Sequence, residues 1–196
     1  MADAYNSRAL VLADVLGATV SGDDPDRRVI EPWADTVHGK ILDVGSGTGR
    51  WTGHLAALGH TVEGVEPAKE FVDLARENHP SVHFRLASIA DLDGTDERWG
   101  GILAWYSLIH MGPDELPEAL AALYRTIEAN GGILLSFFTG PRLAEIDHPA
   151  TAAYLWPMED MSRALEKTGF EISVRHASAD SPHAYIIAHA RARADS

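Results

Sequence analysis

The sequence contains no cysteine among its 196 residues. Disulfides, zinc thiolate sites and cysteine nucleophiles are therefore excluded. Basic side chains are also scarce, because 16 Lys and Arg stand against 29 Asp and Glu, which gives a formal net charge of −13. A surface of this sign repels phosphate backbones, so we expect no nucleic-acid partner.

Long apolar runs are missing as well. No stretch approaches the roughly 18 residues that span a bilayer, and the first residues, MADAYNSRAL, lack the basic and apolar regions of a secretory signal. We therefore expect a cytoplasmic protein without a membrane partner. The composition is that of a globular chain, with 45% hydrophobic residues, and predicts a single domain over residues 1–196.

Hydrophobic periodicity predicts helices and strands in alternation. The alternation implies a mostly parallel sheet, and the closing strand, turn and strand allow an antiparallel edge. The predicted helices lie at 6–16, 28–37, 51–58, 67–75, 116–127 and 158–167. The predicted strands lie at 41–44, 61–65, 82–86, 102–105, 133–138, 170–175 and 184–189.

The first strand runs directly into a glycine-rich turn. Residues 41–49 read ILDVGSGTG, and the helix that follows begins near Arg50. Glycines let a ligand approach the backbone, and a helix N-terminus offers free N–H donors. Glu66 ends the second predicted strand, 17 positions after Gly49, where an acid can accept hydrogen bonds from both ribose hydroxyls. These features predict a crevice that binds a nucleoside.

The spacing of the glycines distinguishes between nucleotide ligands. A dinucleotide fingerprint has the pattern GxGxxG, which would place its third glycine at position 50. That position holds Arg50, and the glycines read GxGxG. A nucleotide-dependent oxidoreductase using the same crevice stays as an alternative that this spacing disfavours.

Residues 42–49, together with Val62 to Pro67, Leu86 to Leu92, Trp105 to Met111 and Gly131 to Leu134, resemble the class I S-adenosylmethionine-dependent methyltransferases. The resemblance covers about residues 38–138. It implies a Rossmann-like three-layer αβα sandwich, with a seven-stranded, mostly parallel sheet and an antiparallel C-terminal strand. Residues 1–37 would then form a helical cap or lid, 38–138 the cofactor-binding core, and 139–196 a substrate-side segment with a hairpin-like edge.

The resemblance also implies S-adenosylmethionine as cofactor, S-adenosylhomocysteine as product, and a set of binding residues. Asp43 would bind the methionine amino group, Glu66 the ribose, and Pro67 and Ala68 the adenine. After the third strand the family often has Gly-Asp-Ala, whereas this chain has Ser88 and Ile89. The implied cofactor residues are Asp43, Gly45, Ser46, Gly47, Thr48, Gly49, Arg50, Trp51, Glu66, Pro67, Ala68, Ser88, Ile89, Ala104 and Trp105.

The end of the fourth strand would lie beside the methyl acceptor. His110 is the candidate catalytic base, since its unperturbed pKa is near 6.5, and Tyr106 is a second candidate. His110 could instead only hydrogen-bond a neighbouring loop. The residues expected around the acceptor are Tyr5, Arg28, Trp33, Arg142 and His148.

We expect an oxygen or nitrogen of a small molecule as the methyl acceptor. Arg28, Arg50 and Arg142 would favour an anionic acceptor, unless they are surface arginines paired with local acids. The histidines near this face or in the tail lack HxxxH or HExxH spacing, so no metal is expected; they are His110, His148, His176, His183 and His189. A non-catalytic regulatory module that binds the cofactor is a further alternative.

Overall fold

The computed structural model describes residues 17–191. Its helices are α3 (Arg27–Thr36), α4 (Arg50–Ala57), α5 (Lys69–Asn78), the 3-10 turn η1 (Ile89–Leu92), α6 (Leu116–Thr126) and α7 (Met158–Thr168). Its strands are β1 (Ile41–Val44), β2 (Val62–Glu66), β3 (His83–Leu86), β4 (Trp99–Ala104), β5 (Ile127–Thr139), β6 (Ala144–Ile146), β7 (Ala153–Trp156), β8 (Phe170–Ala177) and β9 (His183–Ala190). The helix expected at 6–16 lies outside these residues.

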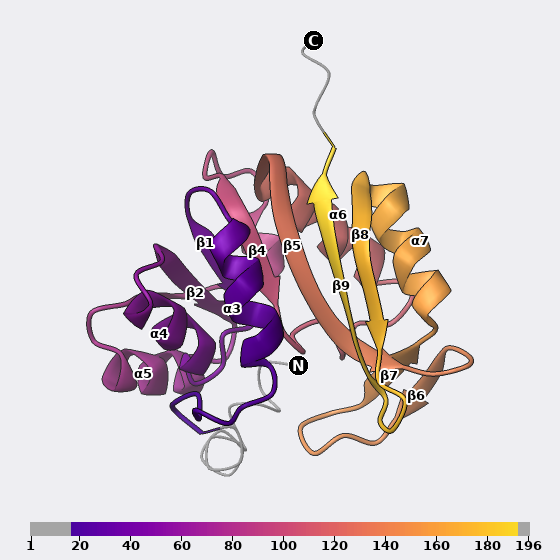
Figure 1. Cartoon of the computed structure of the whole chain (residues 1–196), viewed down its shortest axis with the longest axis horizontal. Coiled ribbons are helices and arrows are strands. Elements are labelled where there is room, and N and C mark those ends of the chain that lie inside the picture. Colours follow the sequence, from indigo (N-terminus) through magenta and orange to yellow (C-terminus); the bar gives the residue numbers. More distant parts are fainter. Residues whose placement is uncertain (1–16, 192–196) are drawn as a thin grey trace.

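The strands form one mixed sheet in which β3, β2, β1, β4 and β5 follow one another in parallel (Figure 1). β9 then pairs antiparallel with β5, and β8 pairs antiparallel with β9. This confirms the predicted Rossmann-like sheet with its antiparallel C-terminal strand, but the sheet formed by the described residues has nine strands instead of the expected seven. The predicted substrate-side segment adds a short hairpin, because β7 pairs with the end of β5 and with β6.

Helices cover both faces of the sheet (Figure 1). On one face, Ile30 of α3 and Leu55 of α4 pack with β1, β4 and β5, and α5 packs on β2 and β3. On the other face, α6 and α7 build the largest apolar cluster, which includes Leu120 and Leu165. None of the helices within residues 17–191 has the length and apolar character needed to cross a membrane.

The prediction of a helix at 116–127 was wrong at its end. The apolar spacing favoured a helix through Ile127, but α6 ends at Thr126 and Ile127 is the first residue of β5. Ile127 is 1% exposed and pairs with Trp99 of β4. A buried residue one turn after Leu123 satisfies both the helical pattern and the sheet, so periodicity could not distinguish them.

The glycines at the start of β4 have a packing explanation. A Cβ on Gly100 would lie 1.8 Å from the carbonyl oxygen of His38, and a Cβ on Gly101 would lie 2.7 Å from Val37. The chain leaving α3 thus crosses directly over β4. This close approach explains why residues 100 and 101 are both glycines.

We predict that Gly100→Ala lowers the free energy of unfolding by about 3 kcal/mol, because backbone must move to admit the methyl group. Urea unfolding followed by circular dichroism measures this change. Gly22→Ala is the matched control, since its Cβ would meet nothing nearer than Arg27 at 3.8 Å. We expect it to stay within about 0.5 kcal/mol of the wild type. Equal stability of the two variants would contradict the close approach of His38 to Gly100.

Candidate functional site

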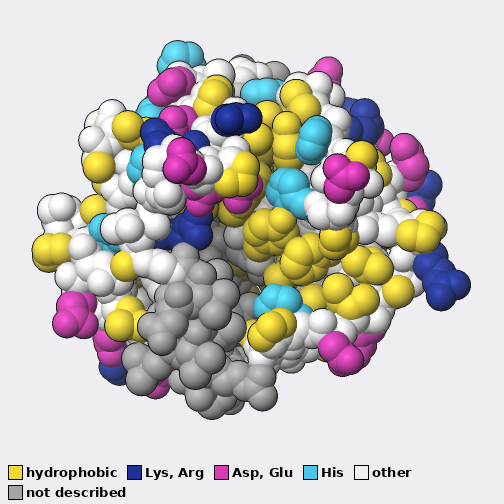
Figure 2. All heavy atoms as spheres, turned by 60° about the horizontal axis from the view of Figure 1, so that its bottom comes forward, with side chains coloured by type: hydrophobic (Ala, Val, Ile, Leu, Met, Phe, Trp, Pro, Cys, Tyr) yellow, Lys and Arg dark blue, Asp and Glu magenta, His cyan; other side chains and the backbone are white. Residues whose placement is uncertain are grey.

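A cavity of about 670 Å³ opens at the carboxyl ends of β1, β2 and β4. This end of the sheet lies at the bottom of Figure 1 and is turned toward the reader in Figure 2, where hydrophobic side chains gather beside histidines. The loops after three neighbouring parallel strands converge there, as is usual for ligand sites in open α/β sheets. The cavity is lined at one end by the glycine loop and at the other by aromatic side chains.

The glycine loop, residues 45–49, is held against β2 by its backbone. The amides of Gly45 and Ser46 both donate to the carbonyl of Val65, at 2.7 and 3.1 Å. Gly45 has a φ of 68°, and a Cβ there would lie 2.5 Å from the Cβ of Ser107. A Cβ on Gly47 would meet nothing within 4 Å. The backbone at Gly47 is therefore open to a ligand.

Two buried carboxyls lie beside this loop. Thr52 Oγ1 donates to Asp43 Oδ2 at 2.6 Å. Glu66 accepts from the amide of Gly47 at 3.0 Å and from that of Ala68 at 2.9 Å. Burial raises the pKa of Asp43 to about 6, against the effect of Thr52. Burial also raises the pKa of Glu66 to about 7, in spite of its backbone donors and with a further contribution from Asp43.

The residues at this end fit S-adenosylmethionine. Ser46 Oγ and Ser107 Oγ line the cavity, are buried, and have no hydrogen-bond partner among residues 17–191. Buried hydroxyls of this kind are normally satisfied by a partner or ligand. Asp43 can accept from an ammonium group and Glu66 from ribose hydroxyls, while Pro67 supplies an apolar wall.

The other end of the cavity is aromatic. Tyr106 follows β4 with a φ of 55°, which is rare for a residue with a side chain, and its amide donates to Ser136 Oγ at 2.7 Å. The rings of Tyr106 and Phe138 lie 5.1 Å apart. Those of His110 and His148 are 5.0 Å apart, edge to face. Tyr106 thus lines the cavity in an unusual backbone conformation.

His110 and Tyr106 differ in their acid–base properties. The backbone carbonyl of Ala152 lies 2.7 Å from Nδ1 of His110, which places the proton of the neutral ring on Nδ1 and makes Nε2 the basic nitrogen. Burial lowers the pKa of His110, and His148 lowers it further. Burial raises the pKa of Tyr106 to about 12, with a smaller contribution from Asp26.

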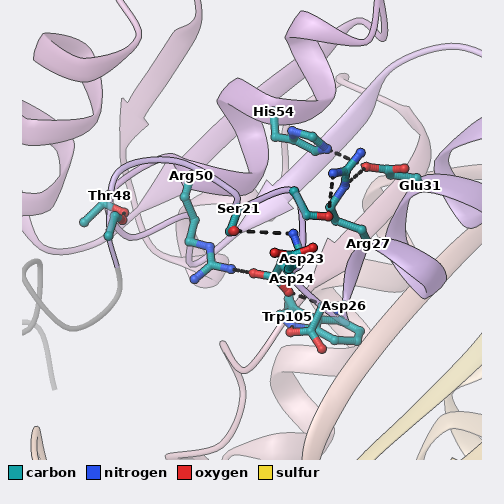
Figure 3. A network of polar contacts seen from close by, with 12 residues as sticks. Ser21, Asp23, Asp24, Asp26, Arg27, Glu31, Thr48, Arg50, His54 and Trp105 are labelled. Carbon is teal, nitrogen blue, oxygen red and sulfur yellow. Dashed lines mark hydrogen bonds and ion pairs between the residues drawn. The ribbon is translucent and has the colours of Figure 1, made fainter.

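A polar segment, residues 17–26, joins the two ends of the cavity (Figure 3). Thr48 Oγ1 donates to the carbonyl of Gly17 at 2.7 Å, Arg50 pairs with Asp24, and Trp105 Nε1 donates to Asp26 Oδ2 at 2.9 Å. Residues 21–26 read SGDDPD, which is typical of a polar turn. The acids of this turn belong to no motif, so the contacts of Asp24 with Arg50 and of Asp26 with Trp105 could not be foreseen.

Most of the predicted residues meet in this cavity. The lining includes Asp43, Gly45, Ser46, Gly47, Thr48, Arg50, Trp51, Glu66, Pro67, Ser88, Ile89, Trp105, Tyr106, His110 and His148. Gly49, Ala68 and Ala104 support it without lining it. The lining that sequence reasoning missed includes Asp26, Phe71, Ser107, Ile109, Met111 and Pro149. Phe71 lies within the predicted helix at 67–75, and Ser107 follows the predicted strand at 102–105. No sequence motif marks either residue as part of a cavity.

The predicted acceptor residues are placed less well. Trp33 is 3% exposed and packs with Ile30 and Leu134 in the core, so it is neither a lid nor a pocket residue. Arg28 and Arg142 are exposed and do not line the cavity. Tyr5 lies outside the described residues. Within 17–191, no three His, Asp or Glu side chains gather as a metal site would require.

The fold and this cavity define a nucleoside-binding α/β domain, and comparison with known proteins narrows the class. Residues 41–131 match the profile of the methyltransferase domain family. This match, together with the curated relatives and solved structures described below, supports a class I S-adenosylmethionine-dependent methyltransferase.

Curated relatives have low to moderate identity. An O-methyltransferase of Penicillium expansum is 28% identical over 79% of this chain and 60% of its own length. A 2-heptyl-1-hydroxyquinolin-4(1H)-one methyltransferase of Mycobacteroides abscessus is 31% identical over 65% of this chain and 63% of its own length. The chain thus spans about three fifths of the length of these relatives.

Solved structures share the fold. The 1,6-didemethyltoxoflavin-N1-methyltransferase of Burkholderia thailandensis, with bound S-adenosylhomocysteine, has a TM-score of 0.72 at 22% identity and covers 97% of this chain and 88% of its own. The magnesium protoporphyrin IX methyltransferase of Synechocystis PCC 6803, with bound S-adenosylmethionine, has a TM-score of 0.74 at 18% identity, covering 96% and 94%.

The raised pKa of Glu66 predicts a pH dependence of stability. A carboxyl whose pKa is about 7 when folded but near 4.5 when unfolded stabilises the protein below about pH 4.5, and this contribution is lost as the pH rises to about 7. The free energy of unfolding of the wild type, minus that of Glu66→Gln, should therefore fall by up to about 3 kcal/mol across this range.

Urea unfolding of both proteins at several pH values measures this difference. Glu77→Gln, at an exposed position of α5, is the control and should show a flat difference. The same flat difference for Glu66→Gln would contradict the burial of a protonated Glu66.

Proposed function

We propose that the protein transfers a methyl group from S-adenosylmethionine to an oxygen or nitrogen of a small-molecule acceptor. The observation that carries this proposal is a single cavity with two chemically different ends. Asp43, Glu66 and the open backbone of Gly47 lie at one end, and Tyr106 and His110 at the other. S-adenosylmethionine, when bound, supplies a methyl group on an activated sulfonium, so the protein must mainly align the acceptor and exclude water.

The lining favours an uncharged, flat acceptor. Trp105, Tyr106 and Phe138 line the cavity, and aromatic side chains suit a planar ligand. Among the described lining residues, Arg50 is the only Lys or Arg, and it pairs with Asp24. The carboxylate of Asp26 also faces the cavity and would repel an anion. This placement favours an uncharged acceptor over the anionic one expected from the sequence, and the hydroxyquinolone in the name of the mycobacterial relative is consistent with a flat one.

The roles of the side chains follow from their places. We propose that Asp43 and Glu66 bind the cofactor, because both carboxyls lie beside the glycine loop. We propose that His110 contacts the acceptor through Nε2 and that Tyr106 contacts it through its hydroxyl. His110 and Tyr106 can each take a hydrogen bond or a proton. Such groups suit a substrate that must lose a proton when it is methylated. The match to the methyltransferase domain and the named methyltransferase relatives favour this function over the oxidoreductase alternative.

Calorimetry with S-adenosylhomocysteine tests the cofactor site. We expect Asp43→Ala to abolish binding and Glu66→Ala to weaken it at least about 10-fold, or about 1.4 kcal/mol, since each removes a buried hydrogen-bond acceptor. Glu63→Ala is the matched control, because Glu63 lies on the same strand but pairs with Arg85 away from the cavity. Circular dichroism verifies that each variant is folded. Unchanged affinity in both cavity variants would overturn the site.

Initial-rate measurements test His110 once an acceptor is known from a screen of labelled methyl donor against metabolite extracts. We expect His110→Ala to lower turnover about 10- to 100-fold while the affinity for S-adenosylhomocysteine changes less than about 2-fold. His83→Ala serves as the control, because His83 is at an exposed position of β3. An unaffected turnover would leave His110 with only a structural role.

A further inference from the structure

Tyr106 meets a histidine that no sequence motif indicated. His183 begins β9, which returns antiparallel along β5 and places His183 opposite Phe138. The Tyr106 hydroxyl is hydrogen-bonded to Nδ1 of His183, and the two rings lie 5.5 Å apart at 45°. Residues separated by 77 positions are thus paired at the acceptor end of the cavity.

The chemistry of the two groups sets the direction of this hydrogen bond. Burial raises the pKa of Tyr106 to about 12, so the phenol keeps its proton at neutral pH. A half-buried hydroxyl needs an acceptor for that proton, and Nδ1 of neutral His183 provides one. Tyr106 therefore donates to Nδ1, and the ring proton of His183 lies on Nε2.

The surroundings of His183 suit a group that gains and loses a proton. Burial lowers its pKa, the charge of Asp26 raises it, and His176 lowers it. The rings of Trp105 and Tyr185 pack against it at 5.6 and 6.1 Å. The half-buried imidazole is neutral and ready to accept at neutral pH, and Asp26 stabilises the imidazolium that forms.

We propose that Tyr106 and His183 act as one proton-accepting pair in methyl transfer. This inference rests on the proposed function and adds His183 as the residue that receives the proton. As the acceptor's O–H or N–H bond breaks, its proton moves to Tyr106 Oη, and the Tyr106 proton moves to His183 Nδ1. The acceptor atom's electron pair forms the new bond to the methyl carbon, the carbon–sulfur bond breaks toward sulfur, and His183 later releases its proton to solvent.

Tyr106 needs His183 for this step. A phenol that holds its proton this tightly cannot act alone as a base, but it can accept one proton while passing on another. His110 is less suited to receive the charge, because it is 6% exposed and its imidazolium would lie beside His148. The imidazolium of His183 would lie near the carboxylate of Asp26 and reach solvent. We therefore assign proton acceptance to His183 and acceptor contact to His110.

Nitrogen-15 NMR of histidine tests the pair without turnover. In the full chain with S-adenosylhomocysteine bound, we expect neutral His183 to be unprotonated at Nδ1, and we expect this signal to shift in Tyr106→Phe. His189, at the opposite end of β9, serves as the internal control and should not shift. A protonated Nδ1 on neutral His183, unchanged in Tyr106→Phe, would overturn the pair.

Methylation of two phenol probes tests the proton transfer itself. His183→Asn keeps an oxygen that can accept from Tyr106 but cannot take a proton. For para-cresol, which must lose a proton, we expect its rate to fall about 100-fold. For para-nitrophenol at about pH 8.5, where the phenol is already ionised, we expect a fall below about 3-fold. His189→Asn should match the wild type with both probes.

The outcomes separate the two proposals. A similar fall with both probes would make His183 merely structural, and no fall with para-cresol would remove it from the reaction; either result overturns the pair. The wild type could bind S-adenosylhomocysteine and yet methylate none of three compounds: para-cresol, para-nitrophenol and the hydroxyquinolone named for the mycobacterial relative. That result would contradict the proposed acceptor class. The NMR result then decides the pair, because a protonated Nδ1 overturns it and the Nδ1-acceptor form with its Tyr106 dependence supports it.

Discussion

The close approach of the glycine loop to its neighbours is the constraint on which the site depends. The Val65 carbonyl receives two loop amides, and Ser107 leaves no space for a side chain on Gly45. This fixed backbone directs the Gly47 amide to Glu66 and leaves the opposite side of Gly47 open. The loop thereby sets the distance between the two buried carboxyls and the end of β4, so the cofactor end and the acceptor end of the cavity share one rigid element.

The segment at residues 17–26 also connects the cofactor end of the cavity with the acceptor end. It contacts the loop through Thr48, the start of α4 through Arg50, and the strand end through Trp105. The Trp105 contact also fixes the carboxylate of Asp26 near Tyr106 and His183, whose pKa values it raises. A segment that looks like a polar turn in the sequence therefore determines the charge at the acceptor end.

The sequence could predict the sheet and the cofactor end because both are encoded locally. The apolar run at 41–44, the glycine spacing and Glu66 lie within one strand, helix and strand unit, so their spacing determines their geometry. Trp33 was misplaced because an aromatic residue on a predicted cap looks the same whether it faces a pocket or the core. His183 could not be predicted, since its partner depends on the register of β9 against β5, which no local pattern specifies.

The acidic side chains at the cavity differ in what controls their charge. Asp43 and Glu66 are removed from water, so burial rather than the surface charge controls their ionisation. Asp26 stays in reach of the acceptor end, where its charge favours a cation that forms there and disfavours an anion that enters. One carboxylate can therefore select an uncharged acceptor and stabilise the proton that this acceptor gives up, which links the specificity of the site to its chemistry.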